Sequence, residues 1–356
     1  MLNRLDDYPV HQTPEPLAHV GTGDRNAYDR YFFNGYAADG SVFFAAALGV
    51  YPNRFVQDAH FSVLRDGVQS SVHASRRAPA ERTDTAAGPV RIEVVEPMRR
   101  HRVTVGPNES GVEADVTFLA RTEAIEEPRF TMRNGTRVTM DYTRLTQFGS
   151  YEGWVAVDGD RVEVTGLLGS RDRSWGIRSV GEREAGAPGP LPQFFWLWAP
   201  LSFDDACLHF DVQEDAEGTR WHRYGAAVPL LGGGDAEPAD QVDWDIRWRS
   251  GTRRSDGATI TVGEHVVELE PLADFQMLGI GYLHPEWNHG SWKGEDVVAG
   301  ERWTVADLEP LAPQHLHVQQ VVRARWGDRV GTGVLEQLVI GRHEPSGFLE
   351  LLDGAR

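Results

Sequence analysis

Apolar and polar residues alternate along several short stretches of the chain. In residues 112–120, apolar side chains occupy the even positions, while Glu, Asp and Thr occupy 113, 115 and 117. In residues 242–249, four valine, isoleucine or tryptophan residues alternate with four charged ones. Successive side chains of an extended strand point to opposite faces. Both stretches therefore predict β-strands with one buried face.

Other segments also favour strands over helices. Residues 41–51 form an apolar run rich in Phe, Val and Ala between Gly and Pro, which favours a strand buried on both faces over a short helix. Residues 61–73 predict a hairpin that turns at Asp66 and Gly67. Residues 316–326 predict a further strand. Helical periodicity is weak and turn signals recur at short intervals, so we expect an all-β barrel or sandwich.

The two halves of the chain share short sequence motifs in the same order. Residues 95–98 match 269–272, and 159–162 match 327–330, with a similar offset near half the chain. The length of 356 residues suits two domains. Common order and offset indicate two related β-domains.

Pro and Gly mark the expected boundaries of these domains. We expect an extended N-terminal arm over 1–25, a first β-domain over 26–183, a linker over 184–192 and a second β-domain over 193–356.

Composition narrows the choice of partners. The net charge is −18, from 53 acidic and 35 basic residues, which disfavours nucleic acids and anionic membranes. No apolar run reaches the length of an integral membrane segment, and the N-terminus has no signal-like apolar core, so a cytoplasmic location is expected. The single Cys207 excludes an internal disulfide, and we interpret it as a core residue.

Residues 169–178 hold the densest charged and aromatic cluster, just before the expected linker. On a strand, Asp172 points away from both neighbouring arginines, whereas Arg173 and Trp175 share a face. An arginine stacked on a tryptophan can present its guanidinium to a carboxylate or carbonyl, and ligands often bind between domains. The alternative is a connection in which these arginines pair with surface acids.

Residues 194–209 form an aromatic segment in which Trp196 and Trp198 share a face and Asp204 and Asp205 follow. Aromatic walls beside a protonated carboxylic acid suit chemistry through a carbocation. Burial against aromatic rings would keep such an acid protonated. Core tryptophans followed by an Asp-Asp turn are the alternative.

Residues 279–295 form a third cluster, in a glycine-rich setting typical of a loop. Pro285 and Gly290 exclude a helical zinc motif. His315 and His317 could place two imidazoles on one strand face, as in cupin metal sites, but no third ligand has a recognisable spacing. The sequence also contains no phosphate-binding loop, dinucleotide fingerprint or nucleophile elbow.

The stretch Gly169-x-Arg-Asp-x-Ser-Trp-Gly-x-Arg178 resembles the Arg-Asp-His-Ser-Trp-Gly signature of the carotenoid 1,2-hydratase (hydroxyneurosporene synthase) family and its lipocalin-like relatives. Residues 194–205, 281–290, 333–337 and 343–347 are similar to features of the same group. The resemblance implies two tandem lipocalin-like antiparallel β-barrels (calycin type) with a hydrophobic pocket. It also implies hydration, cyclisation or pericyclic ring closure of isoprenoid or polyketide molecules, with no redox cofactor.

One position departs from that signature. Arg173 stands where the signature has histidine. An arginine stays charged and cannot shuttle a proton near neutral pH. We therefore expect Arg173 to bind an oxygen-bearing group or to stabilise an enolate.

These observations favour an enzyme for hydration or dehydration, cyclisation or double-bond isomerisation of a hydrophobic isoprenoid- or steroid-like small molecule. A lipocalin-like carrier is the alternative, and a His-ligated metalloenzyme is a weaker one. The candidate catalytic residues are Asp172, Asp204, Asp205, Arg173, His284 and His289. The candidate substrate-binding residues are Trp175, Arg178, Trp196, Trp198, His209, Tyr282, Trp287 and Trp292.

Overall fold

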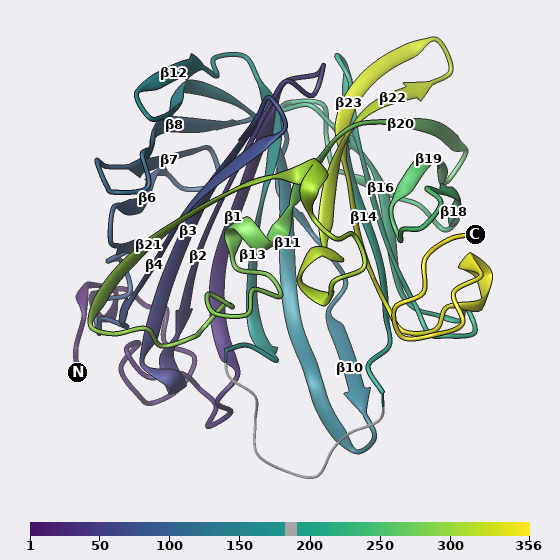
Figure 1. Ribbon diagram of the computed structural model, residues 1–356. Coiled ribbons are helices and arrows are strands. Elements are labelled where there is room, and N and C mark those ends of the chain that lie inside the picture. The colour runs from purple at the N-terminus through teal and green to yellow at the C-terminus, as the bar shows by residue number, and fades with distance from the viewer. Residues whose placement is uncertain (182–190) are drawn as a thin grey trace.

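The computed structural model describes residues 1–181 and 191–356, so most of the predicted linker lies outside the described residues. The described chain is built from two antiparallel sheets with short 3-10 turns between strands (Figure 1). The expected all-β, lipocalin-like class is confirmed. No helix in the described ranges is long and apolar enough to cross a membrane.

The first sheet has the order β21-β4-β3-β2-β1-β13-β11-β8-β7-β6-β5, and β9, β10 and β12 pair with β11. Its strands are β1 (Ala27–Tyr36), β2 (Val42–Tyr51), β3 (Val56–Arg65), β4 (Val68–Arg77), β5 (Ala86–Ala87), β6 (Val90–Glu96), β7 (Arg100–Val105), β8 (Val112–Ala120), β9 (Ile125–Glu126), β10 (Phe130–Asn134), β11 (Arg137–Val157), β12 (Asp160–Glu163), β13 (Leu168–Arg178) and β21 (Asp296–Thr304).

The second sheet has the order β17-β16-β15-β14-β23-β22-β20-β19-β18. Its strands are β14 (Phe194–Ser202), β15 (Ala206–Glu214), β16 (Arg220–Pro229), β17 (Glu237–Pro238), β18 (Val242–Trp248), β19 (Ser255–Val262), β20 (His265–Gln276), β22 (Val318–Trp326) and β23 (Arg329–Ile340). The 3-10 turns are η1 (Arg4–Asp7), η2 (Pro52–Arg54), η3 (Met277–Ile280), η4 (Val305–Asp307), η5 (Pro313–His315) and η6 (Glu344–Ser346).

The strands with the clearest patterns form where the sequence predicts them. The apolar run at 41–51 becomes β2, which is buried on both faces. β3 and β4 pair with Arg65 opposite Val68. Asp66 and Gly67 between them have φ of 51° and 75°, the conformation of a tight type I′ hairpin turn.

The prediction for residues 316–326 is wrong at its first two positions. β22 begins at Val318, because Pro313 starts the 3-10 turn η5 and Leu316 at its end still has helical backbone angles. His315 and His317 therefore do not share a strand face. The Nδ1 atom of His315 lies 2.8 Å from the carbonyl of Glu309, and the Nε2 atom of His317 lies 2.5 Å from Oε1 of Glu336.

β13, which carries the 169–178 cluster, lies between β1 and β11 and so joins the first strand of the sheet to its longest one. β21 comes from the second half of the chain but pairs with β4 at the edge of the first sheet (Figure 1). Each sheet has its own apolar core, and a third core lies between the sheets. In that third core, Phe43 stacks on Phe275 with ring centroids 4.3 Å apart.

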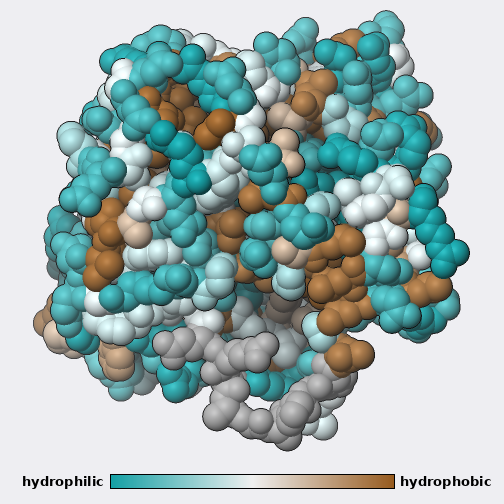
Figure 2. Space-filling view, viewed as in Figure 1, coloured by the Kyte–Doolittle hydropathy of each residue, from teal (hydrophilic) through white to brown (hydrophobic). Residues whose placement is uncertain are grey.

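The surface is mainly polar on the face shown in Figure 2, where hydrophobic residues form separate patches among hydrophilic ones. Cys207 is fully buried, and burial raises the pKa of its thiol to about 11. It behaves as the core residue that the sequence indicates.

Candidate functional site

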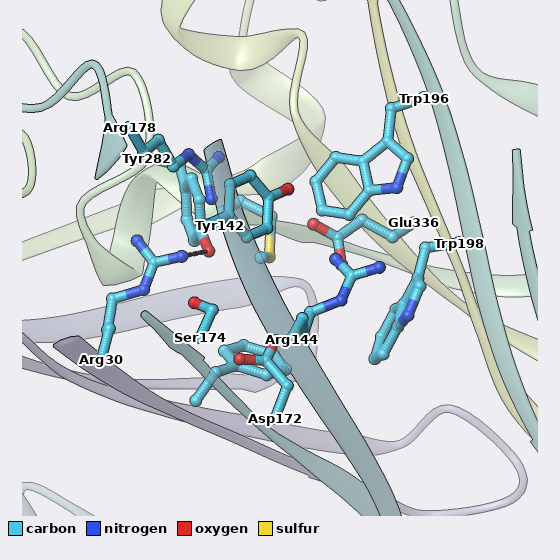
Figure 3. A pocket seen from close by; sticks show the side chains of 12 residues that line it. Arg30, Tyr142, Arg144, Asp172, Ser174, Arg178, Trp196, Trp198, Tyr282 and Glu336 are labelled. Atoms are coloured by element: carbon cyan, nitrogen blue, oxygen red, sulfur yellow. Dashed lines mark hydrogen bonds between the residues drawn. The ribbon is translucent and has the colours of Figure 1, made fainter. Parts of the chain in front are cut away.

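A small cavity lies between the two sheets, beside the third core (Figure 3). Its volume is ≈ 10 Å³, which is room for about one water molecule. Strands β1, β11, β13, β14 and β23 and the segment after β20 contribute its walls. The lining residues are Arg30, Phe32, Tyr142, Arg144, Asp172, Ser174, Arg178, Trp196, Trp198, Met277, Tyr282 and Glu336.

Strand register explains why these side chains meet. On the β1–β13 pair, Arg30 lies opposite Ser174 and Phe32 lies opposite Asp172. Directly opposed residues of an antiparallel pair project from the same face. All four therefore point toward the second sheet, and the intervening Arg173 points away.

Asp172 is the carboxyl group at the centre of this face. Its side chain is buried, and its Oδ1 atom has no hydrogen-bond partner among the described residues. Burial raises the pKa of Asp172 to about 6, although the guanidinium groups of Arg144 and Arg30 act in the opposite direction. A carboxyl group with this pKa is partly protonated near neutral pH and can donate a proton.

Arg144 lies close to Asp172, but other carboxylates already neutralise its charge. Its Nε donates to Oε2 of Glu127 at 2.7 Å, and its Nη2 donates to Oδ2 of Asp211 at 2.6 Å. The guanidinium also contacts the rings of Trp196 and Trp198, at 5.4 and 5.6 Å from their centroids. Arg144 therefore links the two sheets through buried ion pairs.

Arg30 and Arg178 differ from Arg144, because neither forms an ion pair with a described residue. Arg30 is 2% exposed, donates from Nη2 to the Tyr282 hydroxyl, and leaves its Nε without a partner in the described chain. The Tyr282 ring contacts both guanidiniums, at 4.8 Å from Arg30 and 5.4 Å from Arg178. Two uncompensated guanidiniums suit an anionic or carbonyl oxygen of a ligand.

Glu336 is the second carboxylate of the cavity, and its oxygens are engaged. Oε1 pairs with His317, and Oε2 accepts a hydrogen bond from Nε2 of Gln319 at 2.6 Å. Glu336 is thus a fixed wall of the cavity, and Asp172 is the carboxyl group left for proton transfer.

Five of the residues that the sequence singles out line this cavity together: Asp172, Arg178, Trp196, Trp198 and Tyr282. Arg173 and Trp175 instead line a separate, mainly apolar groove of ≈ 550 Å³ on the opposite face of β13. The N-terminal arm forms part of its wall through Leu5 and Leu17. Arg173 pairs with Asp29 there, and its guanidinium lies 3.7 Å from the Tyr31 ring centroid.

Asp204 and Asp205 lie in the exposed turn between β14 and β15, and the fold does not bring them to the cavity. Asp205 pairs with Arg329 at 3.1 Å. Trp292 is 41% exposed and lies against Arg77, also away from the cavity.

His209 is fully buried beside the ion pair of Arg144 and Glu127. Its Nε2 lies 3.3 Å from Oε1 of Glu127, and its ring lies next to Trp198. His209 therefore supports the cavity wall but does not line the cavity.

His284 and His289 belong to a buried cluster that starts on the other side of Tyr282. The His289 ring contacts Tyr282 at 4.7 Å and His60 at 5.2 Å. His284 contacts His73 at 5.2 Å, and Trp287 stacks on His73 at 5.6 Å. Burial lowers the pKa of His73 to about 4 and places that of His289 well below its usual range.

Sequence reasoning missed Arg30, Arg144, Glu336, His60 and His73. The two histidines had a usable signal: in a hairpin that pairs Arg65 with Val68, His60 falls directly opposite His73, as the structure shows. The arginines had none, because nothing near them in the sequence marks them as buried.

A solved structure supports the fold, and a family model matches most of the chain. The family described as a family of unknown function (DUF8625) matches residues 2–349. Among solved structures, a protein assigned as AttH from Nitrosomonas europaea is 14% identical, with a TM-score of 0.58 over 88% of this chain and 92% of that one. CghA is 11% identical, with a TM-score of 0.46 over 90% of each chain. No curated protein sequence matches.

Proposed function

We propose that this chain, which belongs to the family of unknown function DUF8625, is an enzyme that transfers protons to and from a lipophilic substrate bearing a carbonyl or carboxylate oxygen. The observation that carries the proposal is Asp172: a buried carboxyl group with a pKa of about 6 shares one cavity with two uncompensated guanidiniums. The reaction would be a hydration or dehydration or a double-bond isomerisation. Proton transfer alone needs no redox cofactor.

In this proposal Asp172 donates the proton, and Arg30 and Arg178 hold the substrate oxygen. As negative charge develops on that oxygen, guanidiniums held in a dry site stabilise it strongly. An enol or enolate intermediate fits better than a carbocation, because the faces of Trp196 and Trp198 already contact the Arg144 cation. This argues against a cyclisation through a carbocation, which the sequence also allowed.

The cavity volume suits a water molecule, the co-reactant of a hydratase, better than a whole lipophilic substrate. Entry of a larger substrate would therefore require side chains that line the cavity to move. The resemblance of 169–178 to carotenoid hydratases supports an isoprenoid as the substrate class.

Deuterium exchange tests the proposal before the natural substrate is known. Purified protein is incubated in D2O with a panel of unsaturated carbonyl compounds and unsaturated acids of isoprenoid size, and products are analysed by mass spectrometry. We expect deuterium at the carbon that Asp172 protonates, and we expect Asp172→Asn to abolish its incorporation. The proposal fails if that variant exchanges as fast as wild type, with Asp204→Asn as the exposed control.

One observation favours a carrier as the second candidate function. The groove at Trp175 and Arg173 has a volume of ≈ 550 Å³ and mainly apolar walls, which matches typical small-molecule sites. A carrier would bind members of the same panel at this groove and return them unchanged and without deuterium.

A further inference from the structure

We infer that Asp58, His60 and His289 form a binding site for one divalent transition-metal ion of the Zn²⁺ class. Asp58 and His60 lie on β3, and His289 lies in the loop between η3 and β21. The Tyr282 ring separates this triad from the inter-sheet cavity. The inference rests on the triad alone and does not depend on the proposed function.

The spacing of the three side chains suits a shared ion. Oδ2 of Asp58 lies 3.6 Å from Nε2 of His60 and 3.8 Å from Nδ1 of His289. These separations are too long for strong hydrogen bonds. They are within a few tenths of an ångström of the about 3.3–3.5 Å edges expected when N and O ligands surround Zn²⁺ tetrahedrally at 2.0–2.2 Å.

Most polar atoms of the triad lack other partners. Oδ1 of Asp58, Nε2 of His60 and both ring nitrogens of His289 are buried and have no hydrogen bond in the described part of the chain. Oδ2 of Asp58 accepts one hydrogen bond, from the backbone N–H of Gly290 at 2.6 Å, which leaves it a lone pair for an ion. Buried polar atoms are almost always paired, so several unpaired atoms around one point indicate an absent partner. Two imidazoles and one carboxylate form a donor set typical of Zn²⁺ and Fe²⁺ sites.

His73 and Glu301 orient His60 as outer-shell groups. Nδ1 of His60 lies 2.8 Å from Nδ1 of His73, so one of these nitrogens donates and the other accepts. When His60 donates, its Nε2 keeps a lone pair for the ion, and Nε2–H of His73 points toward Glu301 at 3.8 Å. Such hydrogen bonds fix the tautomer of metal-binding histidines.

The neighbouring group of His73, His284 and Glu301 is a poorer metal site. Nδ1 of His284 accepts two backbone hydrogen bonds, from Glu286 at 3.0 Å and Trp287 at 2.8 Å. The ring proton must therefore sit on Nε2, which lies 2.9 Å from Oε2 of Glu301 and donates to it. His284 has no lone pair to offer an ion.

The group of Glu127, His209 and Asp211 is excluded for a different reason. The guanidinium of Arg144 already bonds to both carboxylates and occupies the cation position. The shared proton between His60 and His73 likewise leaves only one of these two histidines free to bind a metal. We therefore expect one ion per chain.

Metal titration of the full chain tests the inference. Protein is stripped with a chelator and titrated with Zn²⁺ by calorimetry, and Co²⁺ is then used as a spectroscopic probe of coordination. We expect one Zn²⁺ per chain and a Co²⁺ spectrum with ligand-field bands of a four- or five-coordinate site. His289→Gln and Asp58→Asn should each lower Zn²⁺ affinity by at least about 100-fold, because loss of an outer-shell partner alone costs about 10–100-fold.

Matched variants separate the metal site from a structural cluster. His284→Gln changes a nearby histidine that has no free lone pair, and it should retain stoichiometric Zn²⁺. His73→Leu should weaken binding about 10–100-fold, and His73→Gln, which can still accept from His60, should restore it. Circular dichroism reports whether each variant folds. The inference is overturned if folded wild type binds no Zn²⁺, or if His289→Gln binds it as wild type does.

Discussion

Asp172 and Arg173 are neighbours in the sequence, but their side chains reach separate cavities on opposite faces of β13. The strand pairs Asp172 with Phe32 and Arg173 with Tyr31, so the two positions face the second sheet and the N-terminal arm respectively. Arg173 therefore lies in the groove and does not line the cavity of Asp172. The two positions can be tested separately.

The first prediction concerns the pH dependence of proton transfer by Asp172. Donation requires the protonated carboxyl group, and its pKa is raised to about 6. Deuterium exchange should therefore fall about tenfold per pH unit above pH 6 and level off below it. Exchange rates between pH 5 and 8 measure this profile. A rate that rises with pH through 6 would assign Asp172 the role of base.

The second prediction concerns stability. In the unfolded chain Asp172 ionises near 3.8, but in the native state it ionises near 6. The native state thus binds the proton more tightly, and the contribution of this group to stability declines as pH rises from about 4 to about 6. Asp172→Asn removes this penalty. At pH 8 it should raise the free energy of unfolding by up to about 3 kcal/mol, from a shift of about two units.

Urea denaturation at pH 4 and pH 8 measures that effect. The difference between Asp172→Asn and wild type should be larger at pH 8, since at pH 4 both native states carry a neutral side chain. An equal difference at both pH values would mean that folding does not raise the pKa of Asp172, because the folded and unfolded chains would then bind the same number of protons at this group.

The third prediction compares two buried arginines of the same cavity. Arg144→Met leaves Glu127 and Asp211 without their shared cation, so it should lower the free energy of unfolding by about 3–5 kcal/mol. Arg30→Met removes a charge without an ion pair in the described chain and leaves only the Tyr282 hydroxyl unpaired. It should cost less than about 2 kcal/mol.

The Arg30→Met substitution should reduce exchange activity more than it reduces the free energy of unfolding. Arg30→Met should remain folded and yet lose exchange activity toward substrates with a carbonyl or carboxylate oxygen. Urea denaturation and the exchange assay together check this pair. Equal destabilisation by Arg30→Met and Arg144→Met would mean that Arg30 also has a structural role and has no free charge for a ligand.

Much of the fold follows from local patterns. Strict alternation located β8 and β18, and the Asp66–Gly67 turn set the β3–β4 register, because a two-residue turn leaves one way to pair the strands. The boundaries at 26–183 and 193–356 stay a prediction. The addition of β21 to the first sheet had no local signal, since it depends on how the two halves pack.

The candidate site was predictable only where strand alternation decides it. Alternation predicts that the side chains of Asp172 and Arg173 point in opposite directions. It also predicts that Trp196 and Trp198 share one face of their strand. Sequence proximity misled at Asp204 and Asp205, because the strand ends before them and the turn carries them into solvent. The sequence does not identify Arg30, because its role depends on tertiary structure. It forms no ion pair with a described residue, and its hydrogen-bond partner Tyr282 lies 252 positions away in the sequence.

The last prediction uses two tryptophans of nearly equal exposure. Trp175 is 42% exposed in the apolar groove, and Trp292 is 41% exposed on the loop before β21. If the groove binds apolar molecules, Trp175→Ala should weaken binding of a fluorescent hydrophobic dye about tenfold, since it removes a large apolar contact worth about 1–2 kcal/mol. Trp292→Ala removes a similarly exposed indole away from the groove and should leave dye affinity unchanged. Dye titration of both variants checks this prediction. Equal losses of dye affinity would indicate non-specific surface binding. A loss in Trp175→Ala alone would locate the ligand beside Arg173, on the face of β13 that Asp172 does not reach.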